Sequence, residues 1–358
     1  MKSISQPRWK EPEYTRKQIN EAGIIVRDSS IQGIKREEAL KVLDNWRSAH
    51  AYPMHVFYIN LRRNAPKKEG VYVVERLKRL DSIVAKLERE KDMQLYRMQD
   101  LGGCRMILPT VEDVYLYADK LKSSRIRHEL LNKKDYIQEP KYSGYRSYHQ
   151  IYRFHTDTLS KQIFNDYCMR IEIQFRTHLQ HLWATAVEMV GLFTGQALKA
   201  GQGEDKFKRF FVLVASLFAL EENCPVVPGT VNDKKLLIEE INEINSTNNV
   251  LDILQIVTIV VRAGNEKQQD KNSFYILQLN YEKKELTAYS FMPSEAEEAN
   301  MMYDKLENEK ANSKIDVVLV RASSFSALKI AYPNYFLDIK EFVSKVYSFL
   351  NEKKNKNI

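Results

Sequence analysis

The chain has 358 residues, of which 44% are apolar, and it carries a formal charge of +8. A chain of this length and composition buries a core of ordinary size and can form two domains, so a disordered polypeptide is excluded. The positive charge permits a polyanionic partner such as RNA or a nucleotide, although many basic proteins bind neither.

The three cysteines, Cys104, Cys168 and Cys224, stand far apart and form no CxxC pair. This spacing excludes a disulfide scaffold and a cysteine-rich zinc site, and it suits a reducing compartment. The first residues lack the apolar stretch of a secretory signal. The longest apolar run, residues 210–220, is too short for a membrane span, which needs ~20 residues. We therefore expect a cytoplasmic protein without a membrane partner.

The hydrophobic pattern of the first 230 residues predicts an α/β (α+β) fold, in which a mixed sheet is flanked by helices. Residues 13–50 are predicted to be mainly helical, with Gly23 and Gly33 as breaks. Residues 69–92 change from a short strand to a charged amphipathic helix. The remaining strands are expected at residues 104–109, 149–154 and 169–177, and the remaining helices at 111–124, 178–193 and 206–222.

A boundary is predicted near residue 230, where a segment rich in Pro and Gly is followed by an Asn-rich one. Beyond it come short strands at 254–263, 273–279, 286–292 and 315–322, an acidic helix at 294–309 and two final helices. We expect a small second domain on a mostly antiparallel sheet. The predicted divisions are a first domain at 1–230, a connecting helix at 231–250, a second domain at 251–322 and C-terminal helices at 323–358.

The first cluster with chemical potential follows the strand near residue 75. It contains Arg76, Lys78, Ser82 and Lys86. Ser82 and Lys86 are four residues apart and are expected to share a helix face with Lys78, so that three hydrogen-bond donors converge. Such a face can hold a triphosphate, and a solvated basic helix face is the alternative.

The second cluster is the segment from Asp100 to Arg105, at the entrance to a predicted strand. A carboxylate at a strand edge, with glycines beside it, is a good place for a magnesium ion. A turn with a capping aspartate is the alternative interpretation.

The third cluster lies between residues 134 and 149. Two lysines, Lys134 and Lys141, precede Tyr145 and His149 there. Lysines can neutralise phosphates, and an aromatic ring can stack on a base, which contributes ~1–3 kcal/mol. A surface hairpin without a ligand is the alternative.

The fourth cluster is a strand in which Glu172, Gln174 and Arg176 alternate and therefore share one face. A glutamate facing Asp100 would complete a carboxylate pair for magnesium, or it would accept the proton of an attacking hydroxyl. A glutamate that only occupies a sheet edge is the remaining possibility.

Together the four clusters resemble the RelA/SpoT nucleotide synthetase family over about residues 70–195, most specifically in GYRSYH (144–149) and EIQFRT (172–177). The resemblance implies a nucleotidyltransferase-like sheet and transfer of pyrophosphate from ATP, with Mg²⁺, to a ribose 3′-hydroxyl. It assigns ATP binding to Arg76, Lys78, Ser82, Lys86 and Arg105. It assigns the magnesium and base carboxylates to Asp100 and Glu172, and stacking on the acceptor base to Tyr145. It places on the acceptor side Lys134, Lys141, His149, Gln174 and Arg176.

Two further segments resemble particular branches of this family. NWRSAHAYP (45–53) with NLRR (60–63) resembles toxic small synthetases that modify tRNA, which makes Arg47, Arg62 and Arg63 candidates for RNA contact, with ordinary solvated charges as the alternative. RASSFSALKIAYPNYFLD (321–338) resembles the fused toxin–antitoxin proteins called CapRel, which defend bacteria against phage. That resemblance implies a pseudo-zinc-finger domain at 251–322. Residues 251–358 contain no Cys and no His, so zinc is not expected there.

The rings of Tyr332 and Tyr335 stand three residues apart on an expected helical turn, so they can point the same way into an adenine pocket. Core packing is the alternative, and the CapRel resemblance favours an inhibitory plug. The resulting hypothesis is an autoinhibited enzyme that a phage protein, expected to be a capsid component, triggers to modify the CCA end of tRNA and stop translation. The alternatives are an alarmone synthetase making (p)ppGpp or (p)ppApp, and an inactive RNA- or phage-sensing module. The inactive module is the less favoured alternative, because the chain has the catalytic residues Asp100, Tyr145 and Glu172.

Overall fold

The computed structural model describes residues 9–124, 126–194, 205–255, 260–263, 274–280, 283, 285–309, 315–322, 328–329 and 339–351. The strands in these ranges form one nine-stranded sheet in the order β3-β4-β5-β2-β1-β9-β7-β8-β6. Its N-terminal half consists of β1 (Tyr72–Leu77), β2 (Gly102–Leu108), β3 (Glu129–Asp135), β4 (Tyr148–Arg153) and β5 (Arg170–Thr177). Its C-terminal half consists of β6 (Val260–Ala263), β7 (Phe274–Asn280), β8 (Glu285–Phe291) and β9 (Ile315–Arg321).

The N-terminal half is a mixed sheet, which confirms the predicted fold class. β2 and β5 are parallel neighbours, whereas β1 with β2, β3 with β4 and β4 with β5 are antiparallel. The parallel pair brings the residues before β2 and those within β5 to one region of the sheet. This topology explains how segments about 70 residues apart in sequence can contribute to one site.

The N-terminal helices are α1 (Arg16–Arg27), α2 (Ile34–Ala49) and α3 (Ala51–Asn64), followed later by α4 (Leu80–Arg89) and α5 (Val111–Ser123). Thr15 caps α1 in a capping box with Gln18. Gly23 lies inside α1, so its prediction as a break is wrong. A Cβ at Gly23 would come 2.7 Å from Cβ of Leu95, in the 3-10 helix η1 (Leu95–Arg97), and the glycine thus permits a close approach. Gly33, at φ +70°, does separate two helices.

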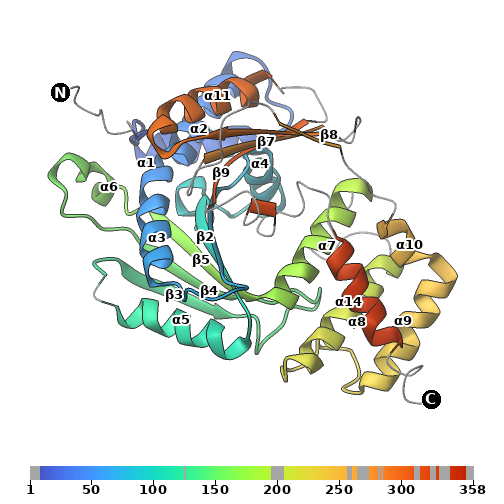
Figure 1. Cartoon of the computed structure of the whole chain (residues 1–358). Coiled ribbons are helices and arrows are strands. Elements are labelled where there is room, and N and C mark those ends of the chain that lie inside the picture. The colour runs from blue at the N-terminus through green and yellow to red at the C-terminus, as the bar shows by residue number, and fades with distance from the viewer. Residues whose placement is uncertain are drawn as a thin grey trace.

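A group of helices lies beside the sheet (Figure 1). It consists of α7 (His178–Thr194), α8 (Asp205–Glu221), α9 (Lys234–Asn248), α10 (Val250–Gln255) and α14 (Lys340–Asn351). Phe342 of α14 packs its ring 5.8 Å from that of Phe211 and 5.9 Å from that of Phe218, measured between centroids. The buried helix expected at 206–222 is confirmed, and helix α14 near the C-terminus packs against it. Short helices connect other elements: η2 (Leu159–Lys161), α6 (Ile163–Asp166) and η4 (Pro293–Glu295).

The C-terminal half of the sheet joins the N-terminal half through β9, which pairs with β1 at Glu75↔Arg321 and Arg76↔Val320. Helix α11 (Ala296–Glu309) packs on β7 and β9. β7 is antiparallel to both β8 and β9, and β6 runs parallel to β8, so this half of the sheet is mostly antiparallel, as expected. Residues 254 and 255 belong to α10, because the helix continues through the start of the predicted strand. The pseudo-zinc-finger assignment and the domain limits stay predictions.

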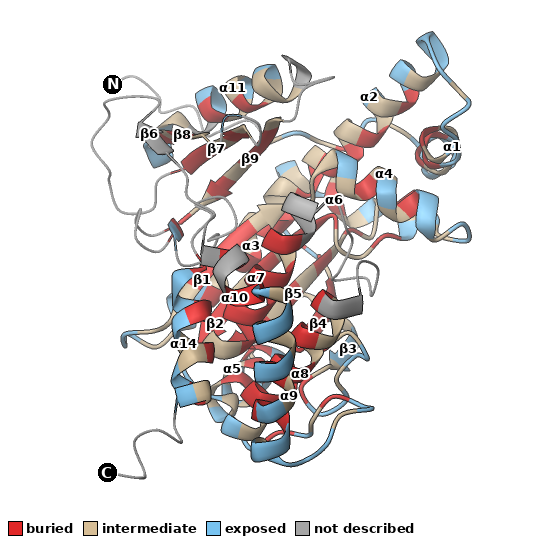
Figure 2. Cartoon of the chain, turned by 90° about the vertical axis from the view of Figure 1, so that its right-hand side faces the viewer, coloured by how far each residue is buried: buried red, intermediate tan, exposed pale blue. Residues whose placement is uncertain are grey.

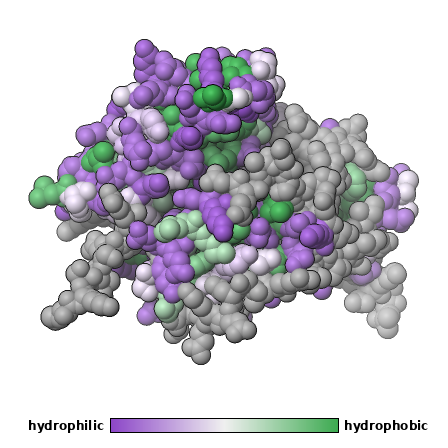
Figure 3. All heavy atoms as spheres, turned by 90° about the horizontal axis from the view of Figure 1, so that it is seen from above, coloured by the Kyte–Doolittle hydropathy of each residue, from purple (hydrophilic) through white to green (hydrophobic). Residues whose placement is uncertain are grey.

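Burial follows the layers of the fold. In Figure 2 the sheet and the inner helix faces are mostly buried, whereas the outer faces of α4 and α9 are exposed. The face seen in Figure 3 is mainly hydrophilic, with hydrophobic side chains in small separate groups. Within the described ranges, no helix combines the length and apolar character that a membrane crossing requires.

Candidate functional site

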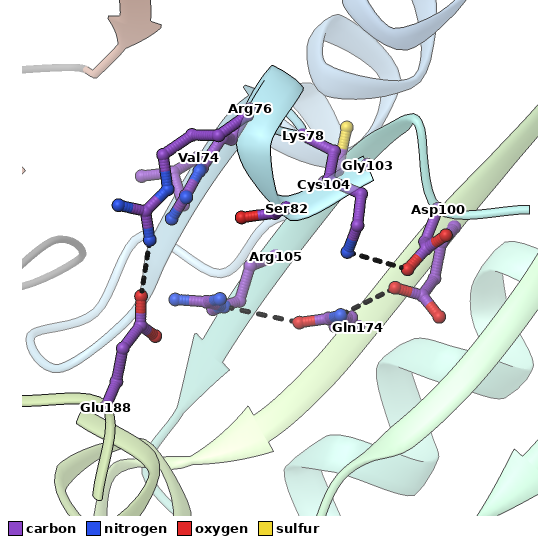
Figure 4. A pocket seen from close by; sticks show the side chains of 12 residues that line it. Val74, Arg76, Lys78, Ser82, Asp100, Gly103, Cys104, Arg105, Gln174 and Glu188 are labelled. Atoms are coloured by element: carbon purple, nitrogen blue, oxygen red, sulfur yellow. Dashed lines mark hydrogen bonds and ion pairs between the residues drawn. The ribbon is translucent and has the colours of Figure 1, made fainter. Parts of the chain in front are cut away.

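Two adjoining cavities open where β1, β2 and β5 lie side by side. The smaller cavity has a volume of about 300 Å³ (Figure 4). Its lining includes Arg76, Lys78, Arg79, Ser82, Asp100, Gly103, Arg105, Glu172, Gln174 and Glu188. The larger cavity, of about 1370 Å³, shares part of this lining, namely Lys78, Ser82, Asp100, Arg105, Glu172 and Gln174. It adds other predicted site residues: Lys86, Lys134, Lys141, Tyr145, His149 and Arg176. Every residue predicted for the synthetase site therefore lines at least one of the two cavities.

Asp100 stands between two lysines on the wall that the cavities share. Nζ of Lys78 lies 3.0 Å from Oδ2 of Asp100, and Nζ of Lys86 lies 3.0 Å from Oδ1. Burial opposes ionisation of this carboxyl, but the two ammonium groups outweigh it and lower the pKa of Asp100 to about 2. Asp100 is therefore ionised at neutral pH, in a site with a surplus of positive charge.

The expected helix face shared by Lys78, Ser82 and Lys86 is wrong in one respect. α4 begins at Leu80, so Lys78 precedes the helix. Its backbone N–H donates to the carbonyl of Leu101 at 2.8 Å, which ties the end of β1 to the segment before β2. This loop contact, and not helical spacing, brings Lys78 to Asp100.

Glu172 is held at both carboxylate oxygens. Nδ1 of His149 lies 2.9 Å from Oε1, and Nε2 of Gln174 donates to Oε2 at 2.6 Å. Burial opposes ionisation of Glu172, but the contacts with His149 and Gln174 outweigh it, so the pKa of Glu172 falls below its ordinary value. Gly103 is its register partner on β2. A Cβ at Gly103 would come 2.9 Å from the carbonyl oxygen of Glu172, so glycine permits the two strands to pair closely there.

Tyr145 is fixed by its hydroxyl and by the turn that precedes it. Its hydroxyl lies 2.9 Å from Nε2 of His149 and accepts a hydrogen bond from Arg176 at 2.5 Å. Burial raises the pKa of Tyr145, so the phenol stays protonated. Gly144 has φ +90°, and a Cβ there would lie 2.9 Å from the ring of Trp183. Only glycine fits this turn without strain.

The residues present suit a magnesium ion. Asp100 and Glu172 offer oxygen ligands to one space, and each carboxylate is ionised for the reasons given above. Among the described residues, no group of three or more Asp, Glu, His or Cys is placed to hold a metal ion without help. Mg²⁺ is commonly held by one or two carboxylates together with substrate phosphates, so this donor set fits it.

Sequence reasoning missed two kinds of lining residue. Arg79 pairs with Glu188 of α7 at 3.3 Å and with Asp316 of β9, and partners so far apart in sequence leave no local pattern. Figure 4 shows Glu188 extending toward the smaller cavity. Tyr136 lines the larger cavity, with Nζ of Lys141 4.6 Å from its ring centroid. It could have been found, because it lies in the basic segment 134–149.

One predicted RNA contact is wrong. The side chain of Arg47 is 2% exposed, its Nε donates to the carbonyl of Lys78 at 2.6 Å, and it contacts the hydroxyl of Tyr303. A buried arginine held by these bonds is not available to RNA. Arg62 and Arg63 are exposed near the end of α3. The predicted regulatory residues Tyr332 and Tyr335 lie outside the described residues.

The fold and the site thus define a mixed-sheet protein with adjoining basic cavities around two carboxylates, an arrangement suited to phosphorylated ligands. Residues 75–190 match a family model described as the region found in RelA / SpoT proteins. The matched region includes most of the lining of both cavities.

Curated relatives match about a third of the chain. GTP pyrophosphokinase YjbM of Bacillus subtilis is 34% identical over 117 residues, which cover 32% of this chain and 53% of the relative. The probable GTP diphosphokinase RSH3 of Arabidopsis thaliana is 32% identical over 128 residues, which cover 34% of this chain and 15% of the relative. The chain thus spans about half the length of the Bacillus relative.

Two solved structures are also similar. The first is small alarmone synthetase 1 of Bacillus subtilis bound to pppGpp, with 21% identity, a TM-score of 0.42, and coverage of 58% of this chain and 99% of that one. The second is a GTP pyrophosphokinase family protein of Streptococcus pneumoniae, with 21% identity, a TM-score of 0.38, and coverage of 63% and 98%.

Proposed function

We propose that the chain transfers pyrophosphate from ATP to a ribose 3′-hydroxyl. The observation that carries this proposal is the shared wall of the two cavities. Lys78, Asp100 and Glu172 lie on it, so a polyphosphate in the smaller cavity and a hydroxyl in the larger one would meet at the same carboxylates. The family match over 75–190 supports the same reaction, because the curated relatives are named as pyrophosphokinases and diphosphokinases.

In the proposed reaction the 3′-oxygen forms a bond to the β-phosphorus of ATP, and the bond from this phosphorus to the oxygen that bridges to the α-phosphorus breaks. AMP leaves with that electron pair, and Glu172 accepts the proton of the attacking hydroxyl. Arg76, Lys78 and Arg105 neutralise the polyphosphate. Mg²⁺, held by Asp100 and Glu172, would offset further phosphate charge. The protein contributes mainly positioning and charge neutralisation, as in phosphoryl transfer generally.

We propose the CCA end of tRNA as the acceptor. The toxic-synthetase-like segments at 45–53 and 60–63 support it, and so does the size of the larger cavity, about 1370 Å³, which exceeds the usual ~300–1,000 Å³ of a small-molecule site. A 3′-pyrophosphate at that end would block aminoacylation and stop translation. A free nucleotide is the second candidate acceptor, favoured by the names of the relatives, which are GTP pyrophosphokinases.

One labelling experiment separates these acceptors. The protein is incubated with ATP carrying label at the β-phosphorus, in parallel with tRNA, GDP and GTP. Label on tRNA alone supports the tRNA acceptor, and label on GDP or GTP supports alarmone synthesis. Label on none of the three, with the wild type and with a Tyr332→Ala/Tyr335→Ala variant alike, would contradict the proposed transfer and favour an inactive sensing module.

We propose further that the C-terminal segment keeps the enzyme inactive until a phage protein binds. The rings of Tyr332 and Tyr335 would occupy the adenine side of the ATP site, near Arg76 and Arg105. Holding the enzyme about 99% closed requires only ~2.7 kcal/mol, which the burial of two aromatic rings can supply. Replacing both tyrosines with alanine should give label transfer without any phage protein. A double variant as inactive as the wild type would rule out the plug.

A further inference from the structure

Five side chains beside the larger cavity close a ring of hydrogen bonds. Nη2 of Arg176 donates to the hydroxyl of Tyr145 at 2.5 Å and to Oε1 of Gln174 at 3.2 Å. The hydroxyl of Tyr145 meets Nε2 of His149 at 2.9 Å. Nδ1 of His149 and Nε2 of Gln174 then reach the two oxygens of Glu172, at 2.9 and 2.6 Å. Two arms therefore leave one guanidinium nitrogen and end on one carboxylate.

The two ends of the ring fix the direction of the bonds that reach them. A guanidinium only donates hydrogen bonds, and an ionised carboxylate only accepts them. Gln174 consequently turns its oxygen toward Arg176 and its amide nitrogen toward Glu172, and Nε of Arg105 donates to the same oxygen at 3.4 Å. This arm allows a single orientation of the glutamine amide.

The other arm runs from the hydroxyl of Tyr145, which accepts from Arg176, through His149 to Glu172. An ionised carboxylate only accepts hydrogen bonds, so Nδ1 of His149 carries the proton of the bond to Glu172.

The strands account for the convergence. Glu172, Gln174 and Arg176 alternate along β5 and share one face, and His149 on β4 is the register partner of Gln174. Arg176 is 2% exposed, so water does not compete for its hydrogen bonds. A buried guanidinium whose Nη2 already serves two neighbours is better suited to orient them than to bind an acceptor phosphate.

We propose that Arg176 is a positioning residue, which acts through both arms to hold the two oxygens of Glu172 in one orientation toward the attacking hydroxyl. The proposal rests on the proposed function for what Glu172 does. A carboxylate has about four lone-pair sites, and the ring uses one on each oxygen. A lone pair on each oxygen stays open to the acceptor hydroxyl, while the carboxylate cannot rotate away from it.

A set of variants tests this role against direct binding of the acceptor. Tyr145→Phe removes one arm and keeps the aromatic ring, and Gln174→Leu removes the other arm. Each should lower kcat roughly 3- to 10-fold, Arg176→Met about 100-fold, and the KM for the acceptor should change less than about threefold. Because Arg176 acts only through the arms, adding Arg176→Met to the double variant Tyr145→Phe/Gln174→Leu should lower kcat less than about threefold further.

The opposite results would overturn the proposal. If Arg176 binds the acceptor, Arg176→Met should raise the KM for the acceptor, and its full effect should persist in the double variant. Arg170→Met is the matched control: Arg170 begins the same strand and donates to the carbonyl of Arg97, outside the ring, so kcat should be unchanged. If Arg176→Met does not fold, Arg176→Lys replaces it in the same comparison. Its single amine can serve one arm, so its kcat should match that of a single-arm variant.

An independent measurement does not require activity. Nitrogen-15 NMR of the histidines, with His149 assigned by comparison with His149→Gln, should show a proton on Nδ1. An unprotonated Nδ1 would overturn the ring. If neither the wild type nor the Tyr332→Ala/Tyr335→Ala variant transfers label to any acceptor, the proposed function and the role assigned to Glu172 fail, whereas this NMR result still decides whether the ring exists.

Discussion

The two halves of the nine-stranded sheet differ in what their side chains do. In the N-terminal half, β1, β2 and β5 direct charged side chains into the cavities. Several of the side chains buried there are ionised and held by hydrogen bonds. In the C-terminal half, β7 and β9 bury apolar side chains on both faces, and α11 covers one of these faces. The N-terminal half therefore lines both cavities with charged side chains, whereas the C-terminal half mainly contributes apolar packing.

The halves are joined by few backbone contacts and several arginines. β1 and β9 share two register pairs. Arg47 contacts Tyr303, Arg79 pairs with Asp316, and Nη1 of Arg321 lies 3.1 Å from Nε2 of His55. Arg79 also pairs with Glu188 and lines the smaller cavity. A change in how the C-terminal half is attached would therefore be felt at the site.

The largest expected effect comes from the carboxylates of the N-terminal half. Asp100→Asn and Glu172→Gln should each lower pyrophosphate transfer roughly 10²- to 10⁴-fold, because each removes a charge or proton acceptor that the reaction uses. Initial rates with β-labelled ATP measure the loss, and circular dichroism checks the fold. Glu88→Gln, an exposed change on α4, is the control and should leave the rate unchanged. Retained activity in either variant would remove that residue from the site.

The next effect is a pH dependence of stability that originates in the N-terminal half. His50 is buried between α2 and α3, and burial lowers its pKa to about 4, whereas the unfolded chain binds the proton near pH 6.5. The folded protein thus binds fewer protons between these values. Its stability should fall by about 3 kcal/mol as pH drops from 6.5 to 4, and this contribution should fall no further below pH 4. Urea unfolding at several pH values measures it.

A variant isolates His50 in that experiment, since the pKa of His128 is also lowered to about 4 by burial. In His50→Gln the fall between pH 6.5 and 4 should shrink by about 3 kcal/mol. Residues 251–358 contain no histidine, so this part of the chain has no histidine of its own to protonate. Protection of the β7 and β9 amides against hydrogen exchange should therefore fall only where β9 loses its pairing with β1. An unchanged pH dependence in the variant would contradict the burial argument.

A smaller effect tests the attachment itself. The side chains of Asp316 and Arg79 are 6% and 14% exposed. Asp316→Asn removes the negative charge that pairs with Arg79, and we expect a loss of about 2 kcal/mol in the attachment of β9. Hydrogen exchange of the β7 and β9 amides should become about 30-fold faster, while exchange in β4 and β5 should not change. Glu297→Gln, an exposed change on α11, is the control. Equal acceleration in both halves would show that they unfold together.

The sequence predicts the N-terminal half better than the C-terminal half, for a physical reason. The alternation of Glu172, Gln174 and Arg176 reflects one strand face, and a strand has a fixed period, so both the element and the cluster could be predicted. Residues 104–109 and 169–177 gave strands that the structure confirms, with shifts of one or two residues at their ends.

The missed features depend on contacts between distant segments. The pairing of β1 with β9 joins residues more than 200 positions apart in the sequence. The ion pair of Arg79 with Asp316 spans a similar separation. Nothing in the local pattern distinguishes Arg47, which is buried, from Arg62, which is exposed on the next helix. The placement of Lys78 beside Asp100 through a backbone bond, and not through helical spacing, is a failure of the same kind.

The smallest expected effect concerns RNA, and it decides which half contacts the acceptor. If tRNA binds through its phosphates, affinity should fall steeply with salt, and the slope of log affinity against log salt should decrease by about one unit for each contacting cation removed. Arg62→Gln and Arg63→Gln, both exposed at the end of α3, should each give that decrease. Lys17→Gln, whose side chain is 86% exposed on α1, is the matched control and should leave the slope unchanged. Lys283 is exposed in the C-terminal half, between β7 and β8. If the slope decreases in Lys283→Gln and not in the arginine variants, the RNA contact belongs to the C-terminal half, and that half does more than attach and pack.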